Sequence, residues 1–465
     1  MAYKNLLKLL TPISGLLLSC LLLLLCFPPF NLYGLAFISL VPILLQIQKY
    51  PSHPFWKGLC FGTLFFGGFN AWIIPLKAFA PIFHIVLLWT SYSLILGIWY
   101  GLLFWLIVRF KTQHPLLIAS LWTLMEILKS LGQFGNPSGS IGYTQAYNLL
   151  WNPLLNSIGT FGLSFIIITL NAYCVLFIIS SKKRTQHTVI IGLLIILPFL
   201  YGLFFSNPLR TSPSIPITIV QPNIPQKDKL NQNKQPQLQK ELLTQLSSIT
   251  STNNLIVLPE TVLTRFNLQI PSFMSAIHSI LKNTPNHLIW GSSSYTPPNT
   301  YNSIIHISPD LTQQRYHKSQ LMPFGEYTPY RKWIEQTPLI NQFLPHDFNN
   351  GPVPAPLYVN QTAYGATICL EGIYSQIYRK LAKKKSEFFI LASNSAWFFD
   401  SSAAKKLFAI AIHRAIETNR YIICASNTGQ SGIITNQGKP FTFPMHQKNS
   451  FSGTIIPIKQ ITPYT

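Results

Sequence analysis

Long runs of apolar residues alternate with short polar segments over the first 206 positions of the chain. The runs cover about residues 6–26, 30–48, 58–76, 82–108, 115–131, 153–180 and 188–206. Because a helix needs roughly 20 apolar residues to cross a bilayer, residues 1–206 are predicted to form a transmembrane bundle of about seven helices. The first run is not followed by a small-residue cleavage site, so we expect a retained anchor rather than a secretory signal.

Basic residues mark alternate loops between these runs. Lys49 and Lys57 flank one such loop, Arg109 and Lys111 lie in the next loop on the same side, and Lys182 lies in the one after. Positively charged loops tend to stay in the cytoplasm, so this bias places the N-terminus inside. With seven spans, everything after the last run is expected to lie outside the cytoplasm.

The formal net charge of +22 invites comparison with nucleic-acid-binding proteins. The distribution of charge argues against that class. Only Glu126 among the twelve acidic residues precedes residue 207, and the basic residues there flank apolar runs. The sequence also contains no recognisable RNA-binding or helix-turn-helix motif. Because a basic surface suits anionic lipid, we expect the lipid bilayer, and not nucleic acid, as the partner.

A different pattern begins after a Pro- and Ser-rich linker at residues 207–214. From residue 215 to residue 465, short apolar strand-like segments alternate with helical ones, which predicts an α/β domain with buried strands. The expected strands lie at about 215–220, 255–258, 287–290, 303–308, 364–369, 388–393, 421–426 and 432–435, and the expected helices near 235–250, 271–282 and 402–418.

Three chemically complementary side chains follow strand-like segments of this domain. Glu260 stands where burial would raise its pKa and suit it to general-base work. Lys318 could stabilise a thiolate or an oxyanion, and Cys369 ends an apolar run as a possible nucleophile. Each has a plainer interpretation, because Glu260 could pair with Arg265, Lys318 could lie on the surface and Cys369 could be core filler.

The cysteines leave a second alternative open. Cys369 and Cys424 are the two that belong to the predicted outer domain. An oxidising compartment would permit a disulfide between them, and sequence cannot measure their separation. A free nucleophile and a structural disulfide are therefore both possible at this point. The remaining cysteines lie in predicted spans as small apolar filler, at Cys20, Cys26, Cys60 and Cys174.

Several short motifs occur in a fixed order over nearly the whole chain. They are Val220–Gln226, Leu258–Thr261, Met322–Tyr327, Ile368–Glu371, Ser393–Phe398, Arg414–Glu417 with Arg420, and Ser426–Gly429, with Glu126 and Gly139–Tyr143 in the apolar half. This series resembles the apolipoprotein N-acyltransferases, a membrane-anchored branch of the nitrilase (carbon–nitrogen hydrolase) superfamily. The resemblance implies a helical membrane bundle followed by a nitrilase-like α-β-β-α sandwich.

The resemblance also implies roles for individual residues. Glu260 falls on the position of the general base, Lys318 on that of the oxyanion-side cation and Cys369 on that of the nucleophile. Glu326 and Glu371 fall on auxiliary acidic positions, which are expected to orient Lys318 and tune the local charge. For both, a hydrogen-bonded turn carboxylate is the structural alternative.

Four further residues are expected to shape the substrate pocket: Leu370, Asn394, Trp397 and Leu230. Core packing is an equal possibility for Trp397, and the amide of Leu370 is a plausible second oxyanion donor. The family commonly has Tyr at the position of Leu370 and Trp at that of Leu230, so these departures concern the choice of substrate more than the class of reaction.

The implied activity is the transfer of an acyl chain from a membrane phospholipid, through a cysteine thioester, to the free α-amine of a diacylglyceryl-cysteine lipoprotein. It needs neither a metal nor an organic cofactor. A monomer in the bacterial inner membrane is expected, with its catalytic domain on the periplasmic side. Two alternatives stay open: a membrane-tethered amidase that uses water as second nucleophile, and a catalytically silent paralogue that binds lipoproteins.

Overall fold

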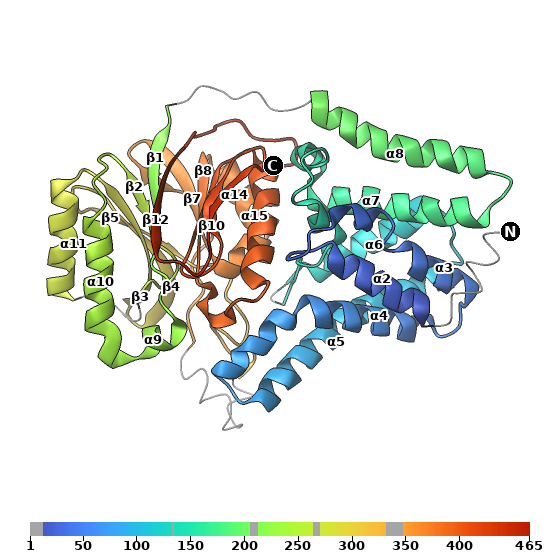
Figure 1. Cartoon of the computed structure of the whole chain (residues 1–465), viewed down its shortest axis with the longest axis horizontal. Coiled ribbons are helices and arrows are strands. Elements are labelled where there is room, and N and C mark those ends of the chain that lie inside the picture. The colour runs from blue at the N-terminus through green and yellow to red at the C-terminus, as the bar shows by residue number, and fades with distance from the viewer. Residues whose placement is uncertain (1–12, 133, 205–212, 264–269, 332–346) are drawn as a thin grey trace. The chain divides into compact units, whose positions relative to one another are not determined.

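The computed structural model describes residues 13–132, 134–204, 213–263, 270–331 and 347–465. The chain divides near residue 207 into two compact units. The first unit consists of helices and the second combines strands with helices (Figure 1). The predicted linker at 207–214 and Arg265 lie largely or wholly outside the described residues.

Each predicted apolar run of the first unit contains a helix. Three of these helices are long and apolar enough to cross a membrane, and a fourth span results if α4 and η2, which are bent by 49°, are counted together. The others are shorter, so the count of seven spans stays a prediction. The helices are α2 (Ser14–Leu25), α3 (Val41–Lys49), α4 (Pro54–Phe69), η2 (Ala71–Ala78), α5 (Ile82–Arg109), α6 (Pro115–Lys129), α7 (Leu155–Ile179) and α8 (Arg184–Phe204).

Helices α4 and α5 pack through small residues. A Cβ atom on Gly58 would collide with the Tyr100 carbonyl, and one on Gly62 would lie 2.8 Å from the Cα of Gly97. In a membrane, where lipid is as apolar as the side chains, such close backbone approach is what favours helix association. The sequence of this unit therefore specifies a packed helix pair as well as apolar surface.

The second unit contains two six-stranded sheets. In the first sheet the order is β12-β1-β2-β3-β4-β5, and in the second it is β11-β10-β9-β8-β7-β6. Strands β1, β2 and β3 run parallel, as do β7, β8 and β9. The strands are β1 (Ile215–Gln221), β2 (Leu255–Val257), β3 (His287–Thr296), β4 (Asn299–Ile307), β5 (Gln313–His317), β6 (Leu357–Val359), β7 (Thr362–Ile368), β8 (Phe388–Ser393), β9 (Ile422–Ser426), β10 (Ser431–Ile434), β11 (Pro440–Phe443) and β12 (Asn449–Ile455).

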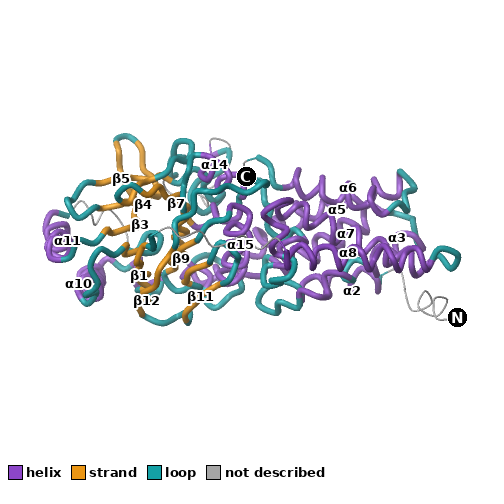
Figure 2. Tube along the Cα trace, turned by 90° about the horizontal axis from the view of Figure 1, so that it is seen from above, coloured by secondary structure: helices purple, strands orange, loops and turns teal. Residues whose placement is uncertain are grey.

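The sheets face each other across an apolar core and carry helices on their outer faces. Inward residues such as Ile219 and Val257 of the first sheet join Ile390 of the second in one buried cluster. Helices α10 (Gln235–Ser247) and α11 (Pro271–Asn283) cover the first sheet, as Figure 2 shows. Helices α14 (Ser375–Lys383) and α15 (Ala403–Thr418) belong with the second sheet, where Tyr378 packs edge-on against Phe389. The expected α-β-β-α sandwich is confirmed.

The observed strands differ from the expected ones mainly at the edges of the sheets. The predicted strand at 287–290 continues to Thr296 and forms a hairpin with β4. The sequence did not predict β6, β11 or β12, although β12 pairs with β1 along its whole length, from Ile215 opposite Ile455 to Gln221 opposite Asn449. Helix α14 was also not predicted.

Candidate active site

Three strands bring the predicted catalytic residues to one polar cluster. Glu260 follows β2, Lys318 follows β5 and Cys369 follows β7. Lys318 is buried and Glu260 is 7% exposed, whereas Cys369 is partly buried. Glu326, from the loop after Lys318, completes the cluster. Side chains that are far apart along the chain thus form the two ion pairs of Lys318, with Glu260 and with Glu326.

The Lys318 ammonium lies between two carboxylates. Its Nζ atom is 2.7 Å from Oε2 of Glu326 and 3.8 Å from Oε1 of Glu260. Burial by itself would lower the pKa of Lys318, but attraction to Glu326 and Glu260 outweighs that effect and raises it above the usual value. The two carboxylates therefore favour the charged form of Lys318 in this site.

Asn302, in β4, links the two carboxylates. Its Nδ2 donates to Oε1 of Glu260 at 2.8 Å and to Oε1 of Glu326 at 2.7 Å. Sequence reasoning missed this residue. Asn302 directly precedes the predicted strand at 303–308, and its partners come from other segments, so no local pattern marks it.

Glu260 is held from a second direction by Asn394. The backbone N–H of Asn394 donates to Oε2 of Glu260 at 2.9 Å. The Asn394 side chain is fixed in turn, because its Nδ2 donates to Gln226 and its Oδ1 accepts from Asn427. Burial raises the pKa of Glu260, and the nearby Lys318 opposes that rise. A carboxylate with a raised pKa takes up a proton readily, as general-base work requires.

Cys369 has a strained backbone at the junction of β7 and η7 (Cys369–Ile373). Its φ is 50°, in the left-handed region that non-glycine residues seldom adopt. The Glu260 carboxylate acts on its thiol. Burial, followed by the negative charge of Glu260, raises the pKa of Cys369, while Lys318 opposes the rise. The raised pKa favours the thiol form of Cys369, and Glu260 is placed to accept the proton of that thiol.

Glu371 connects the backbone next to Lys318 with the backbone next to Cys369. Its Oε1 accepts from the Tyr316 hydroxyl at 2.7 Å, from the Ser319 backbone N–H at 2.7 Å and from the Gln320 N–H at 3.1 Å. Its Oε2 accepts from the Ile368 N–H at 2.8 Å. Burial raises its pKa. Glu371 thus hydrogen-bonds to groups on both sides of the cluster, and the nearby Lys318 opposes the rise of its pKa. Lys318 itself is paired directly with Glu326, and the roles of both glutamates toward it stay predictions.

The disulfide alternative is wrong. Cys424 lies in β9, and β8 separates that strand from β7, whose end carries Cys369. Two strand spacings amount to about 10 Å, beyond the roughly 7 Å that a disulfide can bridge between Cα atoms. Both cysteines are free, and the thiol of Cys369 is available for chemistry.

The other predicted pocket residues differ in exposure. Leu370 and Trp397 are partly buried, and Leu230 is 51% exposed on α9 (Gln226–Leu230). Their contact with substrate stays a prediction. Among the described residues, no three His, Cys, Asp or Glu side chains are grouped so as to hold a metal ion.

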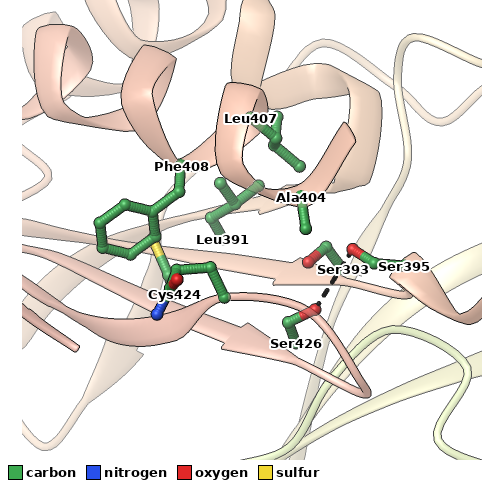
Figure 3. A pocket seen from close by; sticks show the side chains of 9 residues that line it. Leu391, Ser393, Ser395, Ala404, Leu407, Phe408, Cys424 and Ser426 are labelled. Atoms are coloured by element: carbon green, nitrogen blue, oxygen red, sulfur yellow. Dashed lines mark hydrogen bonds between the residues drawn. The ribbon is translucent and has the colours of Figure 1, made fainter. Parts of the chain in front are cut away.

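A small cavity lies at the ends of β8 and β9 beneath α15 (Figure 3). Its volume of about 10 Å³ is the room that one water molecule needs. Ser395 and Ser426 face each other there, with their hydroxyl oxygens 3.4 Å apart. Cys369 is not part of the lining, so this cavity is not the place where an acyl chain would react. It is lined by Leu391, Ser393, Ser395, Ala404, Leu407, Phe408, Cys424, Ser426 and Gln430.

The backbone of Glu260 is fixed by a glycine of the neighbouring strand. A Cβ atom on Gly291, in β3, would overlap the Pro259 carbonyl and lie 2.7 Å from the Cα of Glu260. Only glycine permits this approach. Gly291 directly follows the predicted strand at 287–290, so the sequence pattern alone does not place it inside a strand.

Known proteins resemble both parts of the chain. Residues 19–173 match the family described as apolipoprotein N-acyltransferase N-terminal domain, and residues 217–454 match the carbon-nitrogen hydrolase family. The apolipoprotein N-acyltransferase of Wigglesworthia glossinidia brevipalpis is 30% identical over 74% of this chain and 70% of its own length. Those of Haemophilus influenzae and Coxiella burnetii are each 28% identical over 94% of this chain, covering 88% and 93% of the relatives. The chain therefore belongs to the apolipoprotein N-acyltransferase family.

Proposed function

We propose that this protein transfers an acyl chain from a membrane phospholipid to the α-amine of a diacylglyceryl-cysteine lipoprotein, by way of a thioester on Cys369. One observation carries the proposal. The Glu260 carboxylate acts on the Cys369 thiol and lies 3.8 Å from the ammonium of Lys318. A nucleophile, a base and a cation gathered in one cluster are the groups that acyl transfer requires.

In the first step, Glu260 takes the proton of the Cys369 thiol as the sulfur attacks the ester carbonyl of the phospholipid. The carbonyl oxygen becomes an oxyanion, which Lys318 and the amide of Leu370 stabilise. Collapse of the tetrahedral intermediate breaks the C–O bond. The proton on Glu260 passes to the departing oxygen, so a lysophospholipid leaves and the acyl group stays on sulfur.

In the second step, the α-amine of the lipoprotein attacks the thioester carbonyl. Glu260 removes a proton from the amine, and the C–S bond breaks. The proton returns to the sulfur, which restores the Cys369 thiol and leaves an amide on the lipoprotein. Because the charges that stabilise the oxyanion are fixed before either substrate arrives, both steps use the same preorganised groups.

The apolar helices give the reaction a physical advantage. Both substrates are confined to a bilayer, and an enzyme anchored in that bilayer meets them at high effective concentration. We place the chain in the bacterial inner membrane as a monomer, with the catalytic domain on the periplasmic side. The excess of basic residues in alternate loops supports this orientation.

Leu370 and Leu230 are proposed to contact the lipid or the lipoprotein. Leu370 directly follows the nucleophile and is partly buried, whereas Leu230 is half-exposed. Aliphatic side chains at these positions offer apolar contact without the flat face of an aromatic ring. We therefore expect them to affect the Michaelis constants for the substrates more than the rate of the chemical step.

A reconstituted transfer assay tests the proposal. Purified wild type and Cys369→Ser are incubated with phosphatidylethanolamine and a diacylated lipopeptide, and the lipopeptide mass is followed. Wild type should add one acyl chain and Cys369→Ser none, with Cys424→Ser as the matched control that retains transfer. Transfer by Cys369→Ser at a rate comparable to wild type would exclude the thioester. Release of free fatty acid without lipopeptide acylation would favour a hydrolase, and lipopeptide binding without either product would favour a silent binding protein.

A further inference from the structure

Another buried lysine of the catalytic domain, Lys229, lies beside the proposed general base. Lys229 belongs to α9 and is 1% exposed, which makes it one of the largest fully buried side chains in the described residues. Its Nζ donates to the backbone carbonyl of Thr261 at 2.9 Å. Thr261 is the residue directly after Glu260, so the ammonium reaches the peptide that positions the base.

The conformation of Thr261 needs support of this kind. Its φ is 38°, which is a rare value for a β-branched residue. Residues held in such regions persist where the surroundings over-determine them. The hydrogen bond from Lys229 is one of those constraints, and the N–H of Val262 donating to the Gly291 carbonyl at 3.0 Å is another.

The ammonium of Lys229 also affects the charge balance of the buried cluster. Glu260 and Glu326 contribute two negative charges, whereas Lys318 contributes one positive charge. Glu371 is also fully buried and is acted on by Lys318, so acidic groups outnumber Lys318 here, and uncompensated buried charge is costly. Attraction to Glu260 acts on Lys229, whose ammonium reduces this excess of negative charge.

We propose that Lys229 is a positioning residue, whose ammonium holds the Thr261 carbonyl and stabilises the ionised form of Glu260. This inference rests on the proposed role of Glu260 as the base for Cys369. Lys229 does not touch the nucleophile in this account. It acts through the base, by fixing the adjacent peptide and by adding a positive potential. Burial, partly offset by Glu260, lowers the pKa of Lys229 to about 7, so its charge is sensitive to its surroundings near neutral pH.

Glu260 is an electrostatic partner of Lys229. Within the described part of the chain, Glu260 reaches it from the end of β2. On its own helix, Asp228 forms a surface ion pair and Lys227 is exposed. Lys318, from the end of β5, also faces Glu260. Removal of an opposite charge that acts on a carboxylate raises the pKa of the carboxylate.

The rate at which iodoacetamide alkylates Cys369, measured against pH, tests this inference without requiring acyl transfer. The Cys369 peptide is quantified by mass spectrometry, which separates it from the other cysteines. In wild type the alkylation rate should fall at low pH as Glu260 becomes protonated. This falling part of the pH profile is the acid limb. Lys229→Met should move this acid limb upward by about one pH unit, because the ionised form of Glu260 loses a stabilising charge. Lys227→Met, on the exposed side of the same helix, should leave the limb where it is.

A second variant separates charge from packing. Lys229→Arg keeps the cation and a donor for Thr261, so its acid limb should stay near the wild-type position. The inference is overturned if Lys229→Met lowers alkylation equally at every pH, or if Lys229→Arg shifts the limb as far as Lys229→Met does. Failure of acyl transfer in the wild type, with these alkylation profiles intact, would instead count against the proposed function alone.

Discussion

The ammonium of Lys318 lies 2.7 Å from Oε2 of Glu326, which makes this the shorter of the two ion pairs that Lys318 forms. Glu326 also accepts the Asn302 amide through its other oxygen. The cation of the site is therefore oriented before any substrate binds. A charge fixed in advance stabilises a developing oxyanion without the cost of reorganisation.

Because of this ion pair, Glu326→Gln should change the rates of two reactions in opposite directions. The negative charge of Glu326 contributes to the raised pKa values of Glu260 and Cys369. Its removal should lower both, so alkylation of Cys369 at neutral pH should become faster, by up to about tenfold for one pKa unit. Acyl transfer should become at least about tenfold slower, because Lys318 loses its closest partner. Iodoacetamide labelling and the lipopeptide assay measure the two effects.

A surface glutamate supplies the control for this variant. Glu241 pairs with Lys448 at 3.1 Å, and both side chains are 46% exposed. Glu241→Gln should change neither rate by more than about twofold, because exposed ion pairs contribute little. If Glu326→Gln slowed both reactions in parallel, the variant would merely have disrupted the site.

Glu371→Gln should destabilise the catalytic domain. The carboxylate faces hydrogen-bond donors at both oxygens, whereas an amide would turn its N–H groups toward the donor of Ile368 or toward those of Ser319 and Gln320. We expect a loss of about 2–4 kcal/mol in the free energy of unfolding. Ser319→Ala removes one donor and should cost about 1 kcal/mol. Thermal unfolding followed by circular dichroism compares the stabilities of the two variants. Equal midpoints for Glu371→Gln and wild type would mean that Glu371 does not stabilise the contact between the loop after Lys318 and the turn at Cys369.

Gly291→Ala should displace the general base. The added methyl group would overlap the Pro259 carbonyl, so the segment that carries Glu260 has to move. A shift of this size in a preorganised site should reduce acyl transfer at least about tenfold. Gly192→Ala is the control, because a Cβ there meets nothing within 4 Å. Wild-type transfer by Gly291→Ala would mean that the strand contact does not position Glu260.

Two buried histidines at the other end of β3 and β4 predict an acid-labile domain. The ring nitrogens of His287 and His306 are 2.9 Å apart, and burial, followed by His287, lowers the pKa of His306 to about 3. The unfolded chain binds a proton near pH 6.5 and the folded chain does not, so stability is full above that pH. It should decline as pH falls toward 3, by up to about 1.4 kcal/mol per pH unit for this group.

Replacement of one histidine checks this pH dependence. Thermal midpoints of wild type and His306→Gln are recorded between pH 7 and pH 4. The midpoint of the variant should decline less steeply on acidification, although it starts lower because a buried contact is lost. Parallel curves for the two proteins would contradict the assignment to His306.

The sequence predicted the core of the fold better than its edges. Strands β1, β2, β7, β8 and β9 are short apolar runs whose burial leaves a clear pattern. Strand β12 reads Asn449-Ser-Phe-Ser-Gly-Thr-Ile455 and lies at a sheet edge, where one side of the strand needs no partner and polar residues are tolerated. Its pairing with β1 is decided by tertiary contacts more than 200 residues apart, which no local pattern contains.

The site residues that sequence motifs mark could be predicted. Those that only the tertiary fold brings into the site could not. Glu260, Lys318 and Cys369 stand in recognisable motifs, and the structure brings them together. Asn302 and Lys229 could not be recognised from the sequence, because their partners lie in other segments of the chain. Glu371 was recognised, but its contacts lie with backbone groups near Lys318 and not with the ammonium itself.

The covalent intermediate on Cys369 gives the most direct test of the account. Wild type is incubated with phosphatidylethanolamine alone, and the Cys369 peptide is examined by mass spectrometry before and after treatment with neutral hydroxylamine. The account predicts a peptide heavier by one acyl chain, an equal amount of lysophospholipid, and loss of the added mass with hydroxylamine. If acyl transfer to the lipopeptide proceeds while Cys369 never carries the chain, and lysophospholipid appears only when both substrates are present, the thioester mechanism is wrong.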